Sequence, residues 1–296
     1  MRVAYLGPAG TFSEDAVRSS GFGGVEFEAI PCETILEAIE SIGHGRADRA
    51  MVPIENSIEG SVRNTMDGLA ADADSVRIIG EYVHEVRSTL IAAHPISLEQ
   101  IKVVISHPQP LAQCARFLRE ELPDAELRVA DSTSSAVREV SLGESGLAAL
   151  GPATAAPIYD CVVIREGIED EPGNLTRFVW LAPGGADSPD AGAGSDGPRD
   201  PVTSGWKTTL VFSELGDDQP GALVEALLEF SRRKINLVRI ESRPQRRQLG
   251  RYRFFIDVEG RETDPDVAEA LDGLRLKAGS VRVLGSYPGA SEPSSA

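Results

Sequence analysis

The chain has 296 residues, 41% of them hydrophobic, and a formal net charge of −17. This length is comfortable for two domains, and the apolar content is enough to bury substantial cores. So acidic a chain is a poor nucleic-acid binder, because neutralising phosphates needs clustered Lys and Arg. The negative net charge does not exclude an anionic small substrate, provided that a local site rich in hydrogen-bond donors binds it against the repulsion of the whole protein.

The three cysteines, Cys32, Cys114 and Cys161, are odd in number and far apart in the sequence. They predict free thiols rather than a disulfide framework or a cysteine zinc site, and free thiols suit a reducing cytosol. The four histidines show no metal-site spacing. No long apolar signal core opens the chain, and no run approaches the roughly 18 apolar residues of a membrane span. We therefore expect a cytoplasmic protein with no membrane partner, metal or cofactor.

The first 183 residues alternate short apolar runs with helix-like stretches. Thr11 and Glu14 have the spacing of a capping box that would start the first helix, and a later helix opens near Gly60 and Ser61. The repeated strand, loop and helix predict an α/β fold with parallel sheets and crossover helices. The predicted strands include Val3–Leu6, Ala50–Ile54, Ile101–Ile105, Leu127–Ala130, Ala148–Leu150, Cys161–Ile164 and Leu175–Leu181.

Four loops that follow predicted strands carry hydroxyl, amide or imidazole side chains. The carboxyl ends of parallel strands share one edge of a sheet, and helix amino termini favour anions. We therefore expect a shared anion-binding cleft, the alternative being ordinary cap and turn residues. The candidate binding residues are Thr11 and Ser13, Asn56 and Ser57, His107 and Gln109, and Ser132 and Thr133.

The second part of the chain has a different character. Residues 184–204 are rich in Gly, Ala, Asp, Ser and Pro, which predicts a flexible linker. Residues 205–287 follow the order βαββαβ, the ferredoxin-like plan, and residues 288–296 predict a disordered tail. The linker also predicts that residues 1–183 fold by themselves.

The stretch Gly-Asn-Leu-Thr-Arg-Phe, residues 173–178, starts the last strand of the first region. By itself it indicates a turn and a strand with Phe178 in the core. Thr176 is then a residue of high β propensity. Arg177 is a partner for a carboxylate, a residue that pins the strand of Thr176, or a surface charge.

Taken together, these motifs resemble one family. From Met1 to about Tyr287 the chain resembles prephenate dehydratases, and its second module resembles an ACT regulatory domain. The catalytic motifs are Gly7-Pro8-Ala9-Gly10-Thr11-Phe12-Ser13, Pro53-Ile54-Glu55-Asn56-Ser57, Ser106-His107-Pro108-Gln109 and Asn174-Leu175-Thr176-Arg177-Phe178. The motifs associated with phenylalanine binding are Gly221-Ala222-Leu223 and Glu241-Ser242-Arg243-Pro244.

The resemblance implies a catalytic domain of two α/β lobes, similar to type II periplasmic binding proteins, with the active site between them. It implies conversion of prephenate to phenylpyruvate, with loss of water and carbon dioxide, in L-phenylalanine biosynthesis. It places catalysis at Thr176, Arg177 and Phe178, with Thr176 as the residue tied to activity. It also implies feedback by L-phenylalanine and a homodimer or homotetramer. We expect the monofunctional form, without a chorismate mutase segment.

Two other functions stay open at this point. Arogenate dehydratase performs the same elimination on a substrate with an amino acid side chain. A two-lobed solute sensor would bind the same ligand without catalysis, and the intact Thr-Arg-Phe segment counts against it. A threonine hydroxyl is too weak an acid to serve as a simple general acid. We therefore interpret Thr176 as a hydrogen-bond donor to the departing hydroxyl group.

Overall fold

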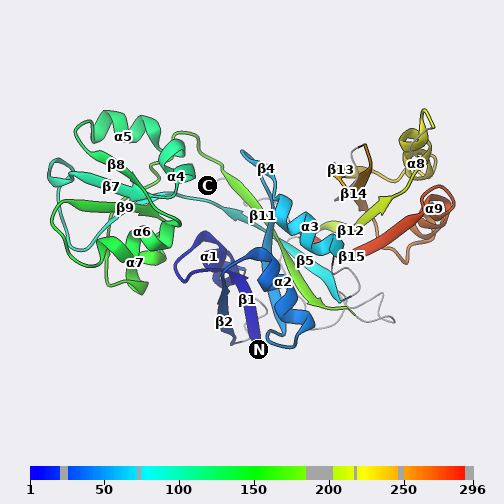
Figure 1. Ribbon diagram of the computed structural model, residues 1–296, viewed down its shortest axis with the longest axis horizontal. Helices are drawn as coiled ribbons and strands as arrows, with labels where there is room; N and C mark the ends of the chain where they lie inside the picture. Colours follow the sequence, from blue (N-terminus) through cyan, green and yellow to red (C-terminus); the bar gives the residue numbers. More distant parts are fainter. Residues whose placement is uncertain (21–25, 72–74, 185–202, 217–218, 246–249, 291–296) are drawn as a thin grey trace.

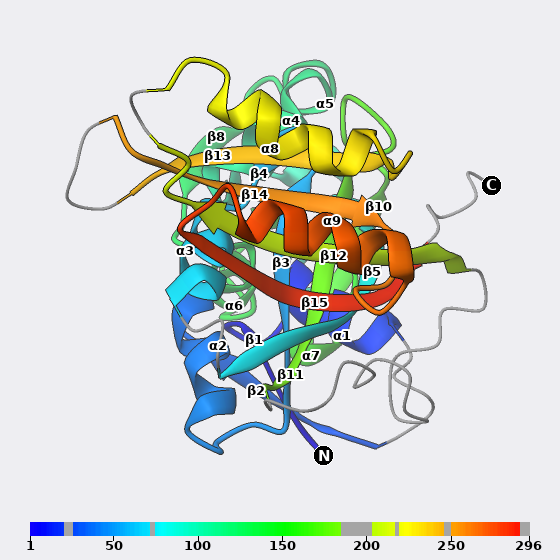
Figure 2. The same ribbon diagram turned by 90° about the vertical axis from the view of Figure 1, so that its right-hand side faces the viewer.

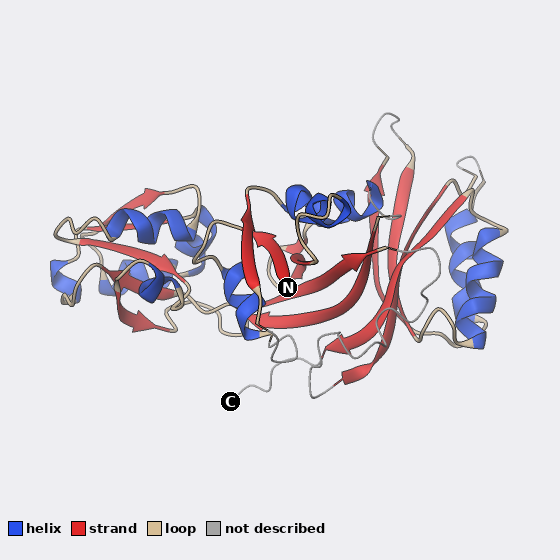
Figure 3. Ribbon diagram, turned by 90° about the horizontal axis from the view of Figure 1, so that it is seen from below, coloured by secondary structure: helices blue, strands red, loops and turns tan. Residues whose placement is uncertain are grey.

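The structure is a computed structural model that describes the whole chain except residues 21–25, 72–74, 185–202, 217–218, 246–249 and 291–296. Three sheets follow one another along the long axis of the molecule. The second sheet lies at one end, the third sheet with its two helices lies at the other, and the first sheet lies between them (Figures 1 and 3).

The first sheet has the strand order β2-β1-β3-β11-β5, and β4 pairs with β3. The amino-terminal strands β1, β2 and β3 are parallel, but β11 runs antiparallel to both of its neighbours. The prediction of a parallel sheet is therefore wrong for the strand that returns from the second lobe. The elements are β1 (Arg2–Leu6), α1 (Phe12–Ser19), β2 (Glu28–Cys32), α2 (Ile35–Gly43), β3 (Arg49–Asn56), β4 (Gly60–Ser61), α3 (Arg63–Ala71), β5 (Val76–Glu85) and β11 (Leu175–Pro183).

The second sheet is also mixed, with the order β10-β6-β9-β7-β8. Only β7, β8 and β9 pair in parallel, while β6 is antiparallel to both neighbours. The helical stretch that follows His107 is divided at the buried Cys114 into two short helices. The elements are β6 (Thr89–Ala92), η1 (Leu98–Gln100), β7 (Val103–Ser106), α4 (Pro108–Gln113), α5 (Ala115–Glu121), β8 (Glu126–Val129), α6 (Thr133–Val140), β9 (Leu147–Gly151), α7 (Ala155–Ile158) and β10 (Val162–Glu166).

The third sheet confirms the predicted βαββαβ order. Its antiparallel strands have the order β13-β14-β12-β15, and α8 and α9 lie over its outer face (Figure 2). Residues 203–204 and 288–290 belong to strands rather than to the predicted linker and tail; 185–202 and 291–296 lie outside the described residues. The elements are β12 (Thr203–Ser213), α8 (Ala222–Ser231), β13 (Leu237–Pro244), β14 (Tyr252–Glu259), α9 (Pro265–Arg275) and β15 (Ser280–Ala290).

Strand β11 contributes to two different cores because successive side chains of a strand point to opposite faces. Phe178 and Trp180 pack with Tyr5 on the face that α1 covers. Val179 and Leu181 pack on the face that carries α2 and α3. Each face of β11 therefore takes part in a separate packing arrangement.

The third sheet packs directly against the first. Val211, Phe255, Leu284 and Tyr287 belong to the same buried cluster as the apolar residues of α2 and α3. At Gly285, an added Cβ would clash with the backbone carbonyl oxygen of Ile78 on β5, so the two strands approach each other as closely as their backbones allow. This shared core argues against the prediction that residues 1–183 fold by themselves.

A buried charge network joins the same two sheets. Arg177 on β11 binds Glu55 (3.0 Å) and Glu81 (3.1 Å) of the first sheet and Asp257 of the third (2.8 Å). Lys207 binds Glu81 at 2.6 Å, and Arg239 binds Asp257 at 2.9 Å. The side chains of Glu81 and Asp257 are fully buried, so the network holds three cations and three carboxylates at the contact between the sheets.

The network determines the charge state of its most buried acid. Burial would raise the pKa of the Asp257 carboxyl, but the charges of Arg177 and Arg239 outweigh burial. With hydrogen bonds from Arg239 and Thr209, they lower that pKa from 3.8 to about 2. Burial would likewise lower the pKa of the Arg177 guanidinium, and the surrounding carboxylates, Asp257 foremost, raise it instead.

The close approach at Gly285 gives a stability prediction. Gly285→Ala should lower the free energy of unfolding by about 1–3 kcal/mol, because the methyl group meets backbone that cannot move aside. Gly43→Ala is the matched control, since the atom nearest to its methyl group is Ser75 Cβ at 3.6 Å, an ordinary van der Waals distance. Denaturant unfolding of both variants tests this, and equal losses would contradict the rigid contact.

Asp257 gives a pH prediction. Its pKa of about 2 in the folded protein lies below the ordinary value of 3.8, so its carboxylate stabilises the fold above about pH 4 and this contribution disappears as the pH falls through 2. The difference corresponds to about 2 kcal/mol. Between pH 5 and pH 2 the parent should lose about that much more unfolding free energy than Asp257→Asn. Parallel pH profiles would show that the carboxylate does not titrate in this way.

Candidate active site

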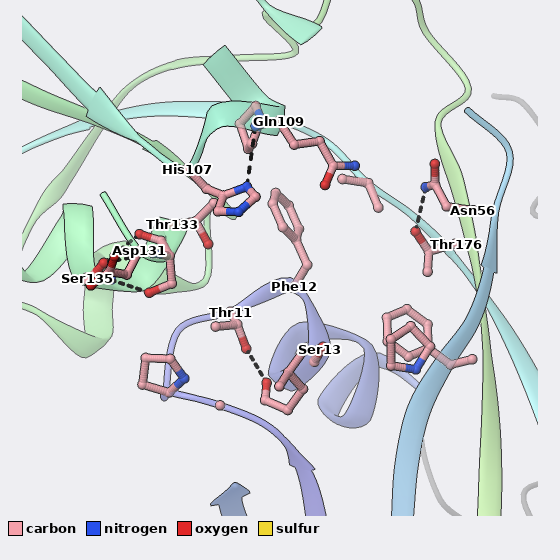
Figure 4. A pocket seen from close by; sticks show the side chains of 18 of the residues that line it. Thr11, Phe12, Ser13, Asn56, His107, Gln109, Asp131, Thr133, Ser135 and Thr176 are labelled. Atoms are coloured by element: carbon pink, nitrogen blue, oxygen red, sulfur yellow. Dashed lines mark hydrogen bonds between the residues drawn. The ribbon is translucent and has the colours of Figure 1, made fainter. Parts of the chain in front are cut away.

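A cavity of about 590 Å³ lies between the two lobes. The first lobe contributes the start of α1 and the adjoining ends of β3 and β11. The second lobe contributes the starts of α4 and α6. Figure 4 shows Thr11, Phe12 and Ser13 on one side, His107, Gln109 and Thr133 on another, and Asn56 with Thr176 facing them.

Most of the predicted site residues line this one cavity, although the loops that carry them are far apart in the sequence. Phe12 and Asn174 also line the cavity. Both belong to the sequence motifs, but we did not predict them as site residues. The predicted residues in the lining are Thr11, Ser13, Asn56, His107, Gln109, Ser132, Thr133, Thr176 and Phe178.

Three helix amino termini meet at the cavity, and side chains cap each of them. The Thr11 hydroxyl accepts from the Glu14 N–H, as the capping box predicts, but the Glu14 carboxylate reaches back to Gly10 N (2.7 Å) rather than to Thr11 N. Ser132 and Ser135 form a reciprocal capping box at the start of α6, and His107 caps α4. The remaining N–H groups of the first turns are available to an anion in the cleft.

The Thr176 hydroxyl has a defined orientation. Asn56 Oδ1 accepts from the backbone N–H groups of Ile58 (3.0 Å) and Glu59 (2.9 Å), which fixes the direction of the Asn56 amide. Its Nδ2 must therefore donate, and it donates to Thr176 Oγ1 at 2.9 Å (Figure 4). Because Thr176 Oγ1 serves as an acceptor on that side, its own proton is free to donate into the cleft.

A chain of amides continues from Asn56 into the second lobe. Asn56 Nδ2 also donates to Asn174 Oδ1 at 2.7 Å, and Asn174 Nδ2 donates to Gln113 Oε1 at 3.3 Å. Gln113 Nε2 is buried and has no hydrogen-bond partner among the described residues. A buried donor without a partner is costly, and this one belongs to a residue that lines the cavity. It is a donor to which a ligand can bind.

The lobes also touch at the rear of the cleft. Tyr159 OH donates to the carbonyl oxygen of Ala9 at 2.8 Å, and Ser134 Oγ donates to the same oxygen. Gly10 adopts a φ of +80° there, and an added Cβ would lie 3.0 Å from the Tyr159 ring. A residue with a side chain would therefore be strained and would push the lobes apart.

No Lys or Arg occurs among the described residues that line the cavity, and its only carboxylates are those of Glu33 and Asp131. The polar groups that face the cavity are chiefly hydroxyls, amides and helix amino termini. Such groups can hold a carboxylate without a cation, because backbone and amide N–H groups bind anions directly.

Two predicted site residues lie outside this cavity. Ser57 accepts from Leu175 N at 3.0 Å and so fastens the start of β11. Arg177 points to the opposite face of β11 from Thr176, into the charge network. Both line a second cavity of about 410 Å³ beside the third sheet. This geometry therefore does not support the prediction that Arg177 binds a substrate carboxylate in the cleft. The alternation of side chains along a strand would have indicated the opposite faces.

Among the described residues, the predicted phenylalanine segment 241–244 does not line the cavity formed by the other one, although Ser242 and Pro244 pair with the lining residues Phe254 and Tyr252. Gly221, Ala222 and Leu223 line a cavity of about 310 Å³ at the start of α8, together with Tyr252 and Phe254. The Glu241 carboxylate instead accepts from Ser61 Oγ (3.1 Å), and Arg243 binds Asp67 (2.9 Å) of the first lobe. Ser242 and Pro244 lie on the same strand, β13, at the edge of the third sheet.

The described residues contain no group of three or more His, Cys, Asp or Glu side chains placed to hold a metal ion. Within the same part of the chain, no helix has the length and apolar character of a membrane-spanning segment.

Comparison with known proteins agrees with this geometry. Residues 3–185 match the family model for prephenate dehydratase, and residues 210–275 match the ACT domain model. A prephenate dehydratase of Mycolicibacterium vanbaalenii is 37% identical over an alignment of 298 positions, and the alignment covers 97% of this chain and 90% of the relative.

Two solved structures share the fold over nearly the whole chain. One is a prephenate dehydratase from Arthrobacter aurescens in complex with L-Phe, with 36% identity, a TM-score of 0.80 and coverage of 97% of this chain and 90% of that one. The other is GqqA, described as a novel type of quorum-quenching acylase, with 28% identity, a TM-score of 0.83 and coverage of 98% of both chains. On the family model and the extent of these matches, the chain belongs to the prephenate dehydratase family.

Proposed function

We propose that the cleft between the lobes converts prephenate to phenylpyruvate, water and carbon dioxide. The observation that carries this proposal is the Thr176 hydroxyl, which Asn56 orients so that its proton can donate into a cleft rich in anion-binding groups. We place the catalytic domain within residues 1–183. The regulatory domain extends from the predicted 205–287 to 203–290, as its strands require.

The substrate has two carboxylates and a ring hydroxyl opposite the ring carboxylate. We assign the carboxylates to N–H and hydroxyl groups at the starts of α1, α4 and α6, with Gln113 Nε2 as a further donor. These groups include Thr11, Ser13, Gln109 and Thr133. Binding through donors of fixed geometry also orients the ring, so that the departing hydroxyl can face Thr176.

The reaction is an elimination across the ring. The C–C bond to the ring carboxylate breaks and releases carbon dioxide, and its electron pair enters the ring. The C–O bond opposite breaks, and the departing oxygen takes up a proton to leave as water. Negative charge develops on that oxygen, so a hydrogen bond from Thr176 is strongest in the transition state. Phe178, which also lines the cavity, supplies an apolar wall for the ring.

The assay of prephenate dehydration also tests two other activities, dehydration of arogenate and hydrolysis of an acylated amine. Arogenate carries an ammonium group, which can approach the Glu33 or Asp131 carboxylate in the lining, so the assay compares arogenate with prephenate. The acylase described for GqqA is tested by following hydrolysis of an N-acylated amide. Phenylpyruvate, detected by its absorbance in alkali, distinguishes the dehydratase from both an acylase and a solute sensor.

We further propose that L-phenylalanine regulates this activity from the third sheet. The helix α8 begins at Gly221, whose φ is +88°, beside the cavity that Leu223, Tyr252 and Phe254 line. The start of α8 can bind the carboxylate of the amino acid, and the apolar lining can hold its ring. The solved L-Phe complex of a relative that is 36% identical supports this ligand.

Oligomerisation would complete the regulatory site. Strand β13 is an edge strand, and its Val238 and Ile240 are exposed. We propose that two copies pair at this edge to form at least a homodimer, which would bring the segment 241–244 of one copy to the α8 cavity of the other. The three free thiols support a reducing compartment such as the cytoplasm.

Thr176→Ala should lower kcat by about 100- to 1000-fold, or about 2.7–4 kcal/mol, with a much smaller change in KM. The reason is that the lost donor acts mainly in the transition state. Thr176→Ser, which keeps the hydroxyl, should retain more activity than the alanine variant. Steady-state kinetics with prephenate measures both variants, and a near-normal kcat for Thr176→Ala would remove this residue from the mechanism.

Gly221→Ala should weaken phenylalanine binding by about tenfold or more in calorimetry. Its methyl group has no protein atom within 4 Å and would enter the space proposed for the ligand, a change worth about 1–3 kcal/mol. Gly143→Ala is the matched control, because Gly143 has a similar φ of +85°, equally open surroundings and a place in the second lobe. Absence of binding to the parent, or equal weakening in both variants, would reject this site.

A further inference from the structure

Adjacent residues of β11 face two different parts of the molecule. Thr176 lies in the cleft, while Arg177 passes through the other face of the sheet to reach Asp257 at 2.8 Å. We infer that Arg177 and Asp257 are positioning residues, and that their buried ion pair holds β11 so that Thr176 stays aligned with Asn56 and the substrate. This inference rests on the proposed role of Thr176 as the donor.

The pairing of β11 shows why an anchor is needed at this point. Thr176 pairs with Asn56 and Arg177 with Glu55, but Phe178 pairs with Pro53, so the register shifts directly after Arg177. The residue left without a partner is Ile54 on β3, so the ladder between β3 and β11 is interrupted here, while the pairing of β11 with β5 continues from Leu175 to Trp180. The guanidinium of Arg177 compensates, because it binds β3 through Glu55, β5 through Glu81 and β14 through Asp257.

Asp257 is held as firmly as the residue that it binds. It is fully buried, and its Oδ2 accepts from both Arg177 and Arg239. Its Oδ1 accepts from Thr209 Oγ1 at 2.8 Å, and that hydroxyl is 2.7 Å from Tyr287 OH. Strands β12, β14 and β15 thus all support the carboxylate, so the position of Arg177 follows the position of the whole third sheet.

The same strand reaches the proposed phenylalanine cavity. Tyr252 and Phe254 of β14 line that cavity on the side of the helices. Asp257, three residues beyond Phe254, points to the opposite face and binds Arg177. A displacement of β14 would therefore act on Thr176 through one intervening ion pair, without requiring the lobes themselves to change.

The chain offers a matched control for this pair. Asp67 and Arg243 also form an ion pair between the first lobe and the third sheet, at 2.9 Å. Asp67 lies on α3 rather than on a strand that pairs with β11. If the ion pairs only dock the third sheet, Asp67→Asn and Asp257→Asn should have similar effects on activity. If Asp257 positions Thr176, only Asp257→Asn should lower kcat.

The experiment measures kcat and KM for prephenate, without phenylalanine, at a temperature at which all variants are folded. Asp257→Asn should lower kcat by about tenfold or more while KM changes by less than about threefold, since misplacement of a catalytic group by about 1 Å can cost about 100-fold. Asp67→Asn should keep kcat within about twofold. Arg177→Lys keeps the charge but replaces the planar fork of five donors with a compact ammonium group on a flexible stem, and it should also lower kcat.

A double variant tests whether the effect passes through Thr176. In a Thr176→Ala background, Asp257→Asn should lower kcat by less than about twofold further, because the group that it positions is already absent. An undiminished loss in that background, equal losses in Asp257→Asn and Asp67→Asn, or a parental kcat in Asp257→Asn would each overturn the inference.

Two further outcomes are also decisive. If Asp257→Asn does not fold, Arg177→Lys takes its place in both the single and the double comparison. A normal kcat in Thr176→Ala would reject the proposed donor and this inference with it. A large loss in Thr176→Ala together with a parental kcat in Asp257→Asn and Arg177→Lys would reject the positioning role alone.

Discussion

The two faces of strand β11 are the constraint on which the rest of the structure depends. The strand returns from the second lobe between β3 and β5, antiparallel to both. Its period of two residues puts Thr176 in the cleft and Arg177 in the contact with the third sheet. The cleft and the third sheet therefore lie on opposite faces of this one strand. Neither side chain can change its direction without altering the packing of Phe178 or Val179.

The cleft reconciles an acidic protein with an anionic substrate. The net charge of −17 repels an anion at long range, but that repulsion between exposed charges is screened beyond about 8–10 Å at ordinary ionic strength. Within the cleft, fixed N–H and hydroxyl groups act at hydrogen-bond distance and in a less polar medium, where they are stronger. Since the described part of the lining has no Lys or Arg, specificity follows from the positions of donors rather than from the amount of positive charge.

The sequence predicted the elements and the cleft better than it predicted how they are arranged. The loop residues came together because strand ends are local features with clear signals, and the ferredoxin-like module was readable from its order. The antiparallel direction of β11 was not readable, because the alternation of side chains along a strand is the same in either direction. The partners of Arg177 are 80 to 122 residues away in the sequence. Only the folded chain shows that Glu81 and Asp257 are buried carboxylates in need of a cation.

The charge network has a different purpose from the apolar core beside it. Largely burying five of these six charges is costly, while the Glu55 side chain stays 40% exposed, and well-packed apolar residues often stabilise such a contact equally well. An apolar contact, however, tolerates sliding by fractions of an ångström, whereas a guanidinium shared by three carboxylates has one good arrangement. A catalytic group must be held to within about 0.5 Å. The network therefore makes physical sense as a device that fixes the register of the third sheet against β11, at the place where that register would determine the direction of the hydroxyl that we propose as the catalytic donor.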